Sequence, residues 1–261
     1  MEALLRELRL GFVALQFLTR VPAPRWVGFE PGWLNASARH FPLVGALVGA
    51  VGAAVLLAAS MLWPPLVAAF LALAATVSTT GAFHEDGLAD TLDALGGSVP
   101  RERALAIMKD SRIGSYGAVS LIVVLGARVA LMAALCAGPW QVVVAAMVLS
   151  HALGRAGAVA LMALLPYAGD AEHAKAKPLA TAIGPVEWMT ALAWGGGLVA
   201  VGVGAGALSP GRAVVVLALA AGVALLMRAW LRRRLGGYTG DTLGAAEQFT
   251  EVAVLLALCT V

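Results

Sequence analysis

Long apolar runs separated by short polar segments dominate the pattern of this chain. Six runs are long enough to cross a bilayer as helices, since a span needs about 20 apolar residues. They cover residues 42–63, 65–83, 116–137, 141–165, 188–208 and 213–231. Pro64-Pro65 and Gly138-Pro139 cannot continue a helix and predict two tight hairpins. The pattern therefore predicts an all-α fold, a polytopic bundle of transmembrane helices.

Both ends of the chain carry a weaker helical pattern. Near the N-terminus, Leu4, Leu8 and Phe12 share one helical face, and arginines lie off it. This amphipathic pattern predicts a helix that lies in the membrane interface. Residues 252–261 are apolar but follow two glutamates, so a seventh span and a helix packed at the interface both stay open. We therefore expect six to seven spans.

Composition agrees with a membrane protein. Hydrophobic residues make up 61% of the chain and charged residues only 13%, far from the shares found in soluble domains. We expect a single integral membrane domain over residues 1–261. Cys136 and Cys259 lie in apolar runs without a CxxC partner, so neither a disulfide framework nor a zinc site is indicated.

The positive charges indicate the orientation. The chain has 18 Lys and Arg residues, and they flank the apolar runs, so we expect a lipid bilayer and no nucleic acid as partner. If the N-terminus is inside, Arg212 is the only loop cation on the outer side. This predicts a cytoplasmic N-terminus and cytoplasmic loops around residues 84–115, 166–187 and 232–246.

Three aspartates follow the second apolar run at helical spacing. Asp86, Asp90 and Asp93 occupy positions i, i+4 and i+7, and they share one face if the helix continues. Like charges at a membrane boundary repel one another and resist desolvation, so a bound cation would stabilise them. Oxygen ligands and a phosphate substrate favour Mg²⁺ or Mn²⁺. The simpler interpretation is a solvated acidic loop that ends the helix.

Residues 108–117 combine positive charge with small donors just before the third run. Lys109 and Arg112 supply the charge, while Ser111 and a glycine-flanked backbone supply close hydrogen-bond donors. This combination suits phosphate binding. The alternative is a positively charged anchor at the membrane surface.

A third cluster, residues 236–244, follows the sixth run and places Tyr238 and Asp241 between glycines. Asp241 is well suited to capping the segment that follows. Topology also brings Asp86, Asp110 and Asp241 to one membrane face, where they can converge on one metal site. Both interpretations stay open.

Charged residues also lie inside the runs. Arg128 and Arg155 need partners in the bundle, because a charge at a helix centre costs about 2.5–3.5 kcal/mol on insertion scales. Arg155 lies nearer the cytoplasmic half and is the better candidate for holding an anionic substrate. His151 is more typical of a histidine whose hydrogen bonds are satisfied inside the bundle than of a ligand-binding residue. Together these residues also support an alternative function, a membrane transporter or channel.

Five motifs occur in order along the chain: residues 17–22 (FLTRVP), 41–45 (FPLVG), 84–90 (HEDGLAD), 109–114 (KDSRIG) and 237–244 (GYTGDTLG). Together they make the chain resemble the cobalamin synthase family, also called adenosylcobinamide-GDP ribazoletransferases, over most of its length. The resemblance implies a magnesium-dependent enzyme of the bacterial inner membrane that acts late in cobalamin biosynthesis.

The implied reaction joins adenosylcobinamide-GDP to α-ribazole, or to α-ribazole 5′-phosphate, and releases GMP. The product is adenosylcobalamin or its 5′-phosphate. We expect in-line attack by the ribazole 5′-hydroxyl on the phosphorus attached to cobinamide. The expected metal ligands are Asp86, Asp90, Asp93 and Asp241, the proton acceptor is Glu85 or Asp93, and the substrate-binding residues are Lys109, Ser111, Arg112, Arg155 and Tyr238. The oligomeric state stays open, with a homo-oligomer as one option.

The acidic pattern is also similar to that of the CDP-alcohol phosphotransferases. Asp86-Gly87 matches their first Asp-Gly, but Asp90 stands where that group continues toward Ala-Arg. Residue roles therefore cannot be transferred from that group. A lipid-type phosphotransferase is kept as an alternative function.

Overall fold

The computed structural model describes residues 1–30, 32–169 and 183–259, which contain helices and no strand. The helices are, in chain order, α1 (Glu2–Leu18), α2 (Trp33–Ser37), the 3-10 helix η1 (Ala38–His40), α3 (Phe41–Ser60), α4 (Pro65–Thr80), α5 (Phe83–Leu95), α6 (Arg101–Ile107), α7 (Ser115–Leu135), α8 (Trp140–Leu164), α10 (Pro185–Gly204), α11 (Pro210–Arg234) and α12 (Gly240–Cys259). The all-α prediction is confirmed. Part of the predicted loop 166–187, residues 170–182, lies outside the described residues.

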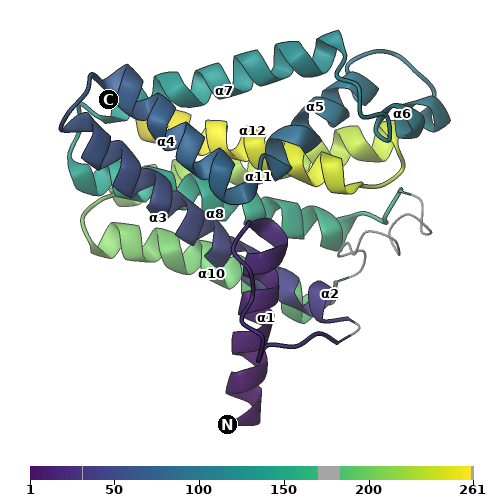
Figure 1. Cartoon of the computed structure of the whole chain (residues 1–261), viewed down its shortest axis with the longest axis horizontal. Coiled ribbons are helices and arrows are strands. Elements are labelled where there is room, and N and C mark those ends of the chain that lie inside the picture. The colour runs from purple at the N-terminus through teal and green to yellow at the C-terminus, as the bar shows by residue number, and fades with distance from the viewer. Residues whose placement is uncertain (31, 170–182, 260–261) are drawn as a thin grey trace.

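The long helices pack side by side as a bundle (Figure 1). Six stretches are long and apolar enough to cross a bilayer: Trp33–Ser60, α7, α8, α10, α11 and α12. The pair α4 and α5 makes a seventh if it is taken as one bent span. The C-terminal segment, which the sequence left open, belongs to the spanning helix α12. The prediction of six to seven spans is confirmed, and the chain is a multi-pass membrane protein.

The chain bends sharply between α4 and α5. Gly81 and Ala82 have φ angles of 71° and 60°, and the two helices meet at 90°. Left-handed backbone at successive residues cannot continue a right-handed helix. The straight run predicted over residues 65–83 is therefore wrong at its end, since α4 stops at Thr80. As a result α5 turns away from the direction of α4.

Glycines allow the central helices to approach one another closely. A Cβ on Gly49 of α3 would lie 2.8 Å from Cα of Val148 in α8. A Cβ on Gly154 of α8 would lie 2.9 Å from Cγ of Glu247 in α12. Small residues at such contacts are typical of helix packing in lipid. They place α8 at the centre of the bundle, where it is the most enclosed of the spanning helices.

Helix α1 runs roughly at right angles to the long helices, with its N-terminus pointing away from the bundle (Figure 1). Leu4 and Leu8 are exposed on it, as an interfacial helix requires. Its polar side is anchored, because Glu7 pairs with Arg39 at 3.0 Å and with His40 at 2.9 Å. The predicted amphipathic helix is therefore present, and its contact with lipid stays a prediction.

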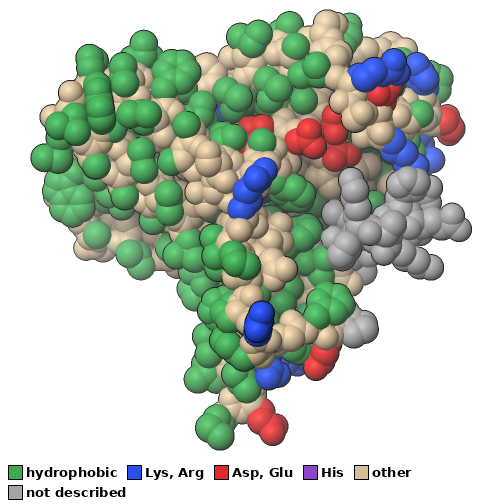
Figure 2. All heavy atoms as spheres, in the orientation of Figure 1, with side chains coloured by type: hydrophobic (Ala, Val, Ile, Leu, Met, Phe, Trp, Pro, Cys, Tyr) green, Lys and Arg blue, Asp and Glu red, His purple; other side chains and the backbone are tan. Residues whose placement is uncertain are grey.

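The two ends of the bundle differ in their polar residues. One end holds α5, α6 and the turn between α11 and α12 (Figure 1), and we call it the acidic end. On the visible face, acidic and basic side chains gather mainly there, while the opposite end is mostly apolar (Figure 2). The candidate chemistry lies at the acidic end and in the interior beneath it.

Candidate active site

Helix α5 carries the predicted stripe of aspartates. Asp86, Asp90 and Asp93 lie within its 13 residues, so their i, i+4 and i+7 spacing does place them along one side. Asp241, in the first turn of α12, lies against the same helix. A Cβ on Gly87 would be only 2.8 Å from the carbonyl oxygen of Asp241, so only glycine permits this approach. Two segments about 150 residues apart therefore meet, as the topology argument predicted.

The electrostatics of Asp90 show how closely these carboxylates lie. Burial, and after it the neighbouring charges of Asp241, Asp86 and Asp93 in that order, raise the pKa of Asp90 to about 7. Carboxylates that lie close together favour a bound cation, because it reduces their mutual repulsion. Oxygen donors of this kind suit a hard divalent ion such as Mg²⁺. The residues present therefore fit the metal that the sequence predicts.

Capping of α12 is performed by a different residue. The Thr239 side-chain oxygen accepts the backbone N–H of Thr242 at 3.3 Å, and the Thr242 side-chain oxygen accepts that of Thr239 at 2.9 Å. This reciprocal pair satisfies donors at the helix start. The alternative in which Asp241 serves only as a cap therefore loses its main support.

Two of the predicted residues are held by other contacts. Asp93 accepts the backbone N–H groups of Gly114 at 2.7 Å and Gly117 at 2.8 Å, and so fixes the start of α7. Glu85 is buried and points into the bundle, where it lies 3.3 Å from Arg128. Neighbouring helix positions face directions about 100° apart. This rotation separates Glu85 from the stripe that contains Asp86.

The basic loop is attached to this site through Asp93. Lys109, Ser111 and Arg112 are exposed at the acidic end, just before α7. Arg112 donates to Asp110 at 2.9 Å and 2.5 Å, and this pairing lowers the pKa of the Asp110 carboxyl to about 2. Asp110 therefore balances Arg112 within the loop instead of joining the aspartates of α5.

An arginine of α11 holds the far end of α5, and an arginine of α6 holds the turn after α11. Arg234 donates to the carbonyl oxygens of Leu95 at 2.9 Å and Gly97 at 2.7 Å. Arg101 donates to the carbonyl of Leu235 at 2.7 Å, which ties the turn after α11 to α6. Cations at a helix C-terminus satisfy its free carbonyls and its dipole. These contacts fix the direction in which the aspartate stripe runs.

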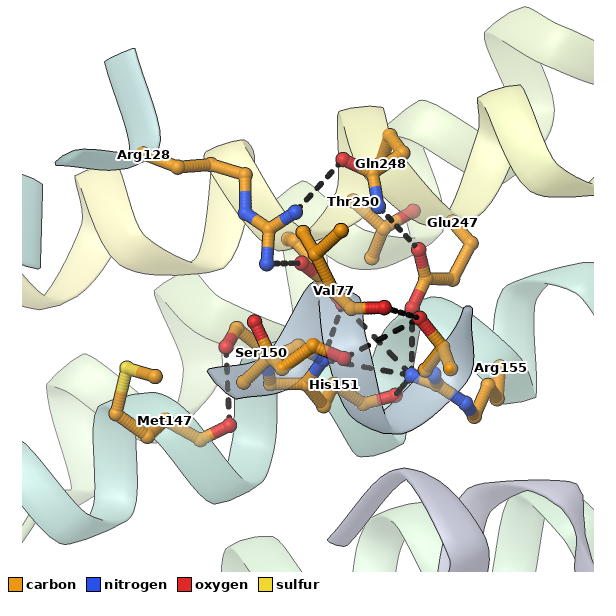
Figure 3. A network of polar contacts seen from close by, with 12 residues as sticks. Val77, Arg128, Met147, Ser150, His151, Arg155, Glu247, Gln248 and Thr250 are labelled. Atoms are coloured by element: carbon orange, nitrogen blue, oxygen red, sulfur yellow. Dashed lines mark hydrogen bonds and ion pairs between the residues drawn. The ribbon is translucent and has the colours of Figure 1, made fainter. Parts of the chain in front are cut away.

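A second polar cluster lies inside the bundle, where side chains of α7, α8 and α12 meet (Figure 3). Arg128 of α7 contacts Glu251 at 2.6 Å and Gln248 at 2.8 Å, both from α12. Arg155 of α8 contacts Glu247 at 2.5 Å, and His151 contacts Glu251. We call these residues, with Glu85, the interior network. Its charges have opposite-sign partners, as intramembrane charges require.

Part of the interior network has the spacing of a metal site. Ligand atoms of His151, Glu247 and Glu251 all lie within 4.8 Å of one another. However, guanidinium groups already occupy the neighbouring space and pair with both carboxylates. We therefore interpret the network as a structural cluster that fastens α7, α8 and α12 together.

A cavity opens between α1, α3, α5, α8 and α12. It encloses about 550 Å³ outside the protein atoms, part of it open to solvent. Two predicted substrate-binding residues, Arg155 and Tyr238, line it. Its aromatic walls include Phe17 and Phe41, which begin two of the sequence motifs, and Phe83, which directly precedes a third. The cavity lies directly beside the first turns of α5 and α12, which carry the aspartates.

Comparison with known proteins decides the family. The sequence model described as cobalamin-5-phosphate synthase matches residues 11–259, nearly the whole chain. The chain belongs to this family. It is similar to the adenosylcobinamide-GDP ribazoletransferase of Leptothrix cholodnii, with 55% identity over 98% of this chain and 97% of that protein.

Two further relatives carry the same name. The protein of Albidiferax ferrireducens is 42% identical over 96% of this chain and 97% of its own length. That of Shewanella amazonensis is 41% identical over 99% and 97%. No solved structure matches the chain at a significant level. Membership of the cobalamin-5-phosphate synthase family disfavours the transporter and the lipid-type phosphotransferase.

In this member of the cobalamin-5-phosphate synthase family, sequence reasoning missed two kinds of residue. Phe17 and Phe41 belong to the quoted motifs, but the motifs do not show that these rings meet Phe83 in one cavity, because the three come from helix ends far apart in the chain. The partners of Arg128 and Arg155 could have been found from the sequence, because Glu247 and Glu251 lie one turn apart in a largely apolar segment. That spacing indicates two carboxylates on one helix face.

Proposed function

We propose that the chain joins adenosylcobinamide-GDP to α-ribazole, or to its 5′-phosphate, and releases GMP. The observation that carries this proposal is the meeting of Asp86 and Asp90 of α5 with Asp241 of α12, in a chain of this family. Such a site suits a pyrophosphate substrate, whose cleavage depends mainly on positioning and charge stabilisation. The reaction is a phosphotransfer to an alcohol.

We assign the metal to the aspartates. Mg²⁺ held by Asp86, Asp90 and Asp241, with Asp93 at the edge of the set, would neutralise charge that develops on the leaving phosphate. The aspartates would hold this ion from two helices at once. Gly87 keeps those helices close enough for both to contribute.

The remaining residues would position the substrates and accept the proton of the ribazole hydroxyl. Lys109, Ser111 and Arg112 would bind phosphate oxygens, since they are exposed beside the aspartate stripe. The ribazole 5′-hydroxyl oxygen would bond to the phosphorus attached to cobinamide as the bond to the GMP oxygen breaks. Its proton would pass to a carboxylate, and Asp93 remains the candidate because Glu85 is turned toward Arg128.

Release of GMP tests the activity directly. Purified protein in detergent micelles is given adenosylcobinamide-GDP and α-ribazole, with Mg²⁺ or with EDTA, and GMP is followed by chromatography. We expect GMP and adenosylcobalamin in equal amounts with Mg²⁺, and neither with EDTA. A transporter would need a sealed vesicle to show activity, so the absence of GMP from micelles would contradict the proposal.

We also propose that the acidic end faces the cytoplasm in the inner membrane, on the distribution of Lys and Arg. Single cysteines are introduced into a chain without Cys136 and Cys259, and intact cells are treated with a thiol reagent that does not cross the membrane. Cysteines at positions 138 and 209 should react, and one at position 98 should not. The opposite result would reverse the orientation.

A further inference from the structure

We infer that the aromatic-lined cavity seats the flat heteroaromatic base of the acceptor nucleoside, leaving its ribose to reach the aspartates. This inference rests on the proposed function, which requires a ribazole acceptor. The cavity contains about 550 Å³ of space outside the protein atoms, including space that is open to solvent. The side chains that line the cavity suit a planar, largely apolar ring.

The cavity walls are aromatic on several sides. The ring of Phe17 lies 5.6 Å from that of Phe41 and 5.5 Å from that of Phe83. Tyr238 lies opposite in the lining, with its ring 5.6 Å from that of Tyr167. Aromatic side chains bind nucleobases by stacking, which is worth about 1–3 kcal/mol per base. Rings contributed by α1, α3, α5 and two loops therefore favour an aromatic ligand.

The polar lining offers a donor that lacks a partner. Arg155 is 2% exposed, and its Nε and Nη2 atoms have no hydrogen-bond partner among the described residues. Glu247, by contrast, is already used by Arg155 at 2.5 Å and by Gln248 at 3.0 Å. A buried unsatisfied donor costs about 1–3 kcal/mol, so a ligand that supplies an acceptor is favoured.

The base of a ribazole can use this donor. It has one ring nitrogen with a free lone pair, which can accept a hydrogen bond from Arg155. Guanine also carries acceptors, O6 and N7, that an arginine binds. The choice of the acceptor base over guanosine therefore depends on where the cavity lies.

The place of the cavity also fits an acceptor. Phe83 and His84 line it and directly precede the acidic part of α5, while Gly240 lines it and directly precedes Asp241. A base seated there has its ribose next to the aspartates, where the 5′-hydroxyl must react. An acyl chain from the bilayer could fill the apolar part but would leave Arg155 without an acceptor.

Paired phenylalanine variants test the assignment in the intact protein. Phe83→Leu removes a lining ring, and Phe70→Leu is the matched control, because Phe70 is 57% exposed on α4 away from the cavity. We expect Phe83→Leu to raise the KM for α-ribazole about tenfold, from the loss of one stacking contact. The KM for adenosylcobinamide-GDP should stay the same, and Phe70→Leu should change neither.

A cavity-filling variant provides a second measurement. Ala158→Leu adds bulk from α8 into the lining and should also raise the KM for α-ribazole alone. If both variants release GMP with an unchanged KM for α-ribazole, the cavity assignment is wrong while the transferase function stands. A rise in the KM for the nucleotide donor instead would assign the cavity to guanosine. Absence of GMP release from the unaltered protein would overturn the proposed function itself.

Discussion

The aspartate stripe and the interior network hold carboxylates in opposite circumstances. In the stripe, burial and the charges of Asp241 and Asp86 raise the pKa of Asp90. In the network, Glu247 and Glu251 meet Arg155 and Arg128 at 2.5 Å and 2.6 Å. Both clusters use α12, and they lie within a few turns of each other.

The comparison distinguishes carboxylates that are paired within the fold from carboxylates that we expect to bind a ligand. Where the chain itself supplies the cation, removal of one partner leaves a buried charge, so the pair stabilises the fold. In the stripe, carboxylates lie close to one another, and we expect them to bind a cation from solution. We therefore expect substitutions in the two clusters to act on different properties, stability in one and catalysis in the other.

Neutralising Glu251 should have the largest effect on stability. Glu251→Gln leaves Arg128 and His151 without their carboxylate inside the membrane, which should cost about 3–5 kcal/mol. Thermal unfolding in detergent measures this loss. Asp90→Asn is the contrasting variant: without Mg²⁺ it should keep or raise the melting temperature, because it relieves repulsion. Equal destabilisation by both variants would remove the distinction between the clusters.

Neutralising Asp241 should affect catalysis instead. Asp241→Asn removes a proposed metal ligand, and we expect GMP release to fall at least about 100-fold, from the several kcal/mol that a metal contributes. The melting temperature should change little, because Thr239 and Thr242 cap α12. Glu102→Gln, an exposed acid in α6 at the same end, is the control and should retain full activity. Normal GMP release by Asp241→Asn would show that the aspartates do not form one site.

Separating α5 from α12 should give a smaller effect. Gly87→Ala places a methyl group 2.8 Å from the carbonyl oxygen of Asp241 and should cost about 1–3 kcal/mol through overpacking. The displaced helices should also weaken Mg²⁺ binding, which calorimetry measures. Gly126→Ala in α7 meets open space and serves as the control. Unchanged Mg²⁺ affinity in Gly87→Ala would show that the close approach is not needed for the site.

The smallest expected effect is on pH dependence. Asp90 has a pKa raised to about 7, above its ordinary value, so the folded state binds its proton more tightly than the unfolded state does. Without divalent cations, stability should therefore fall as pH rises from 4 to about 7. Protons should also compete with Mg²⁺, so apparent Mg²⁺ affinity should be weaker at pH 6 than at pH 8. Calorimetric titrations at both values test this, and Asp90→Asn should abolish the difference.

The sequence predicted the parts of the site that obey short-range rules. Helical spacing placed Asp86, Asp90 and Asp93 on one side of α5, and counting spans brought Asp241 to the same end. The amphipathic N-terminal helix and the spans followed from hydrophobic periodicity. Each of these depends on residues near in sequence or on the number of membrane crossings.

Other features required the three-dimensional structure. The 90° bend depends on left-handed backbone at Ala82, which is uncommon for a residue other than glycine. The direction of Glu85 depends on the rotation of α5, which its contact with Arg128 fixes. The cavity depends on rings brought together from helix ends, and no periodicity encodes such a meeting.

The shortness of α4 has a consequence for the surrounding lipid. With 16 residues it is about 24 Å long, less than the roughly 30 Å of a bilayer's hydrocarbon core. A helix shorter than the core is accommodated by a thinner bilayer, by snorkelling of flanking residues or by association with other helices. We therefore expect bilayer thickness to influence how deep the bend that starts α5 lies, and the acyl-chain length of the lipid to affect the activity of the enzyme.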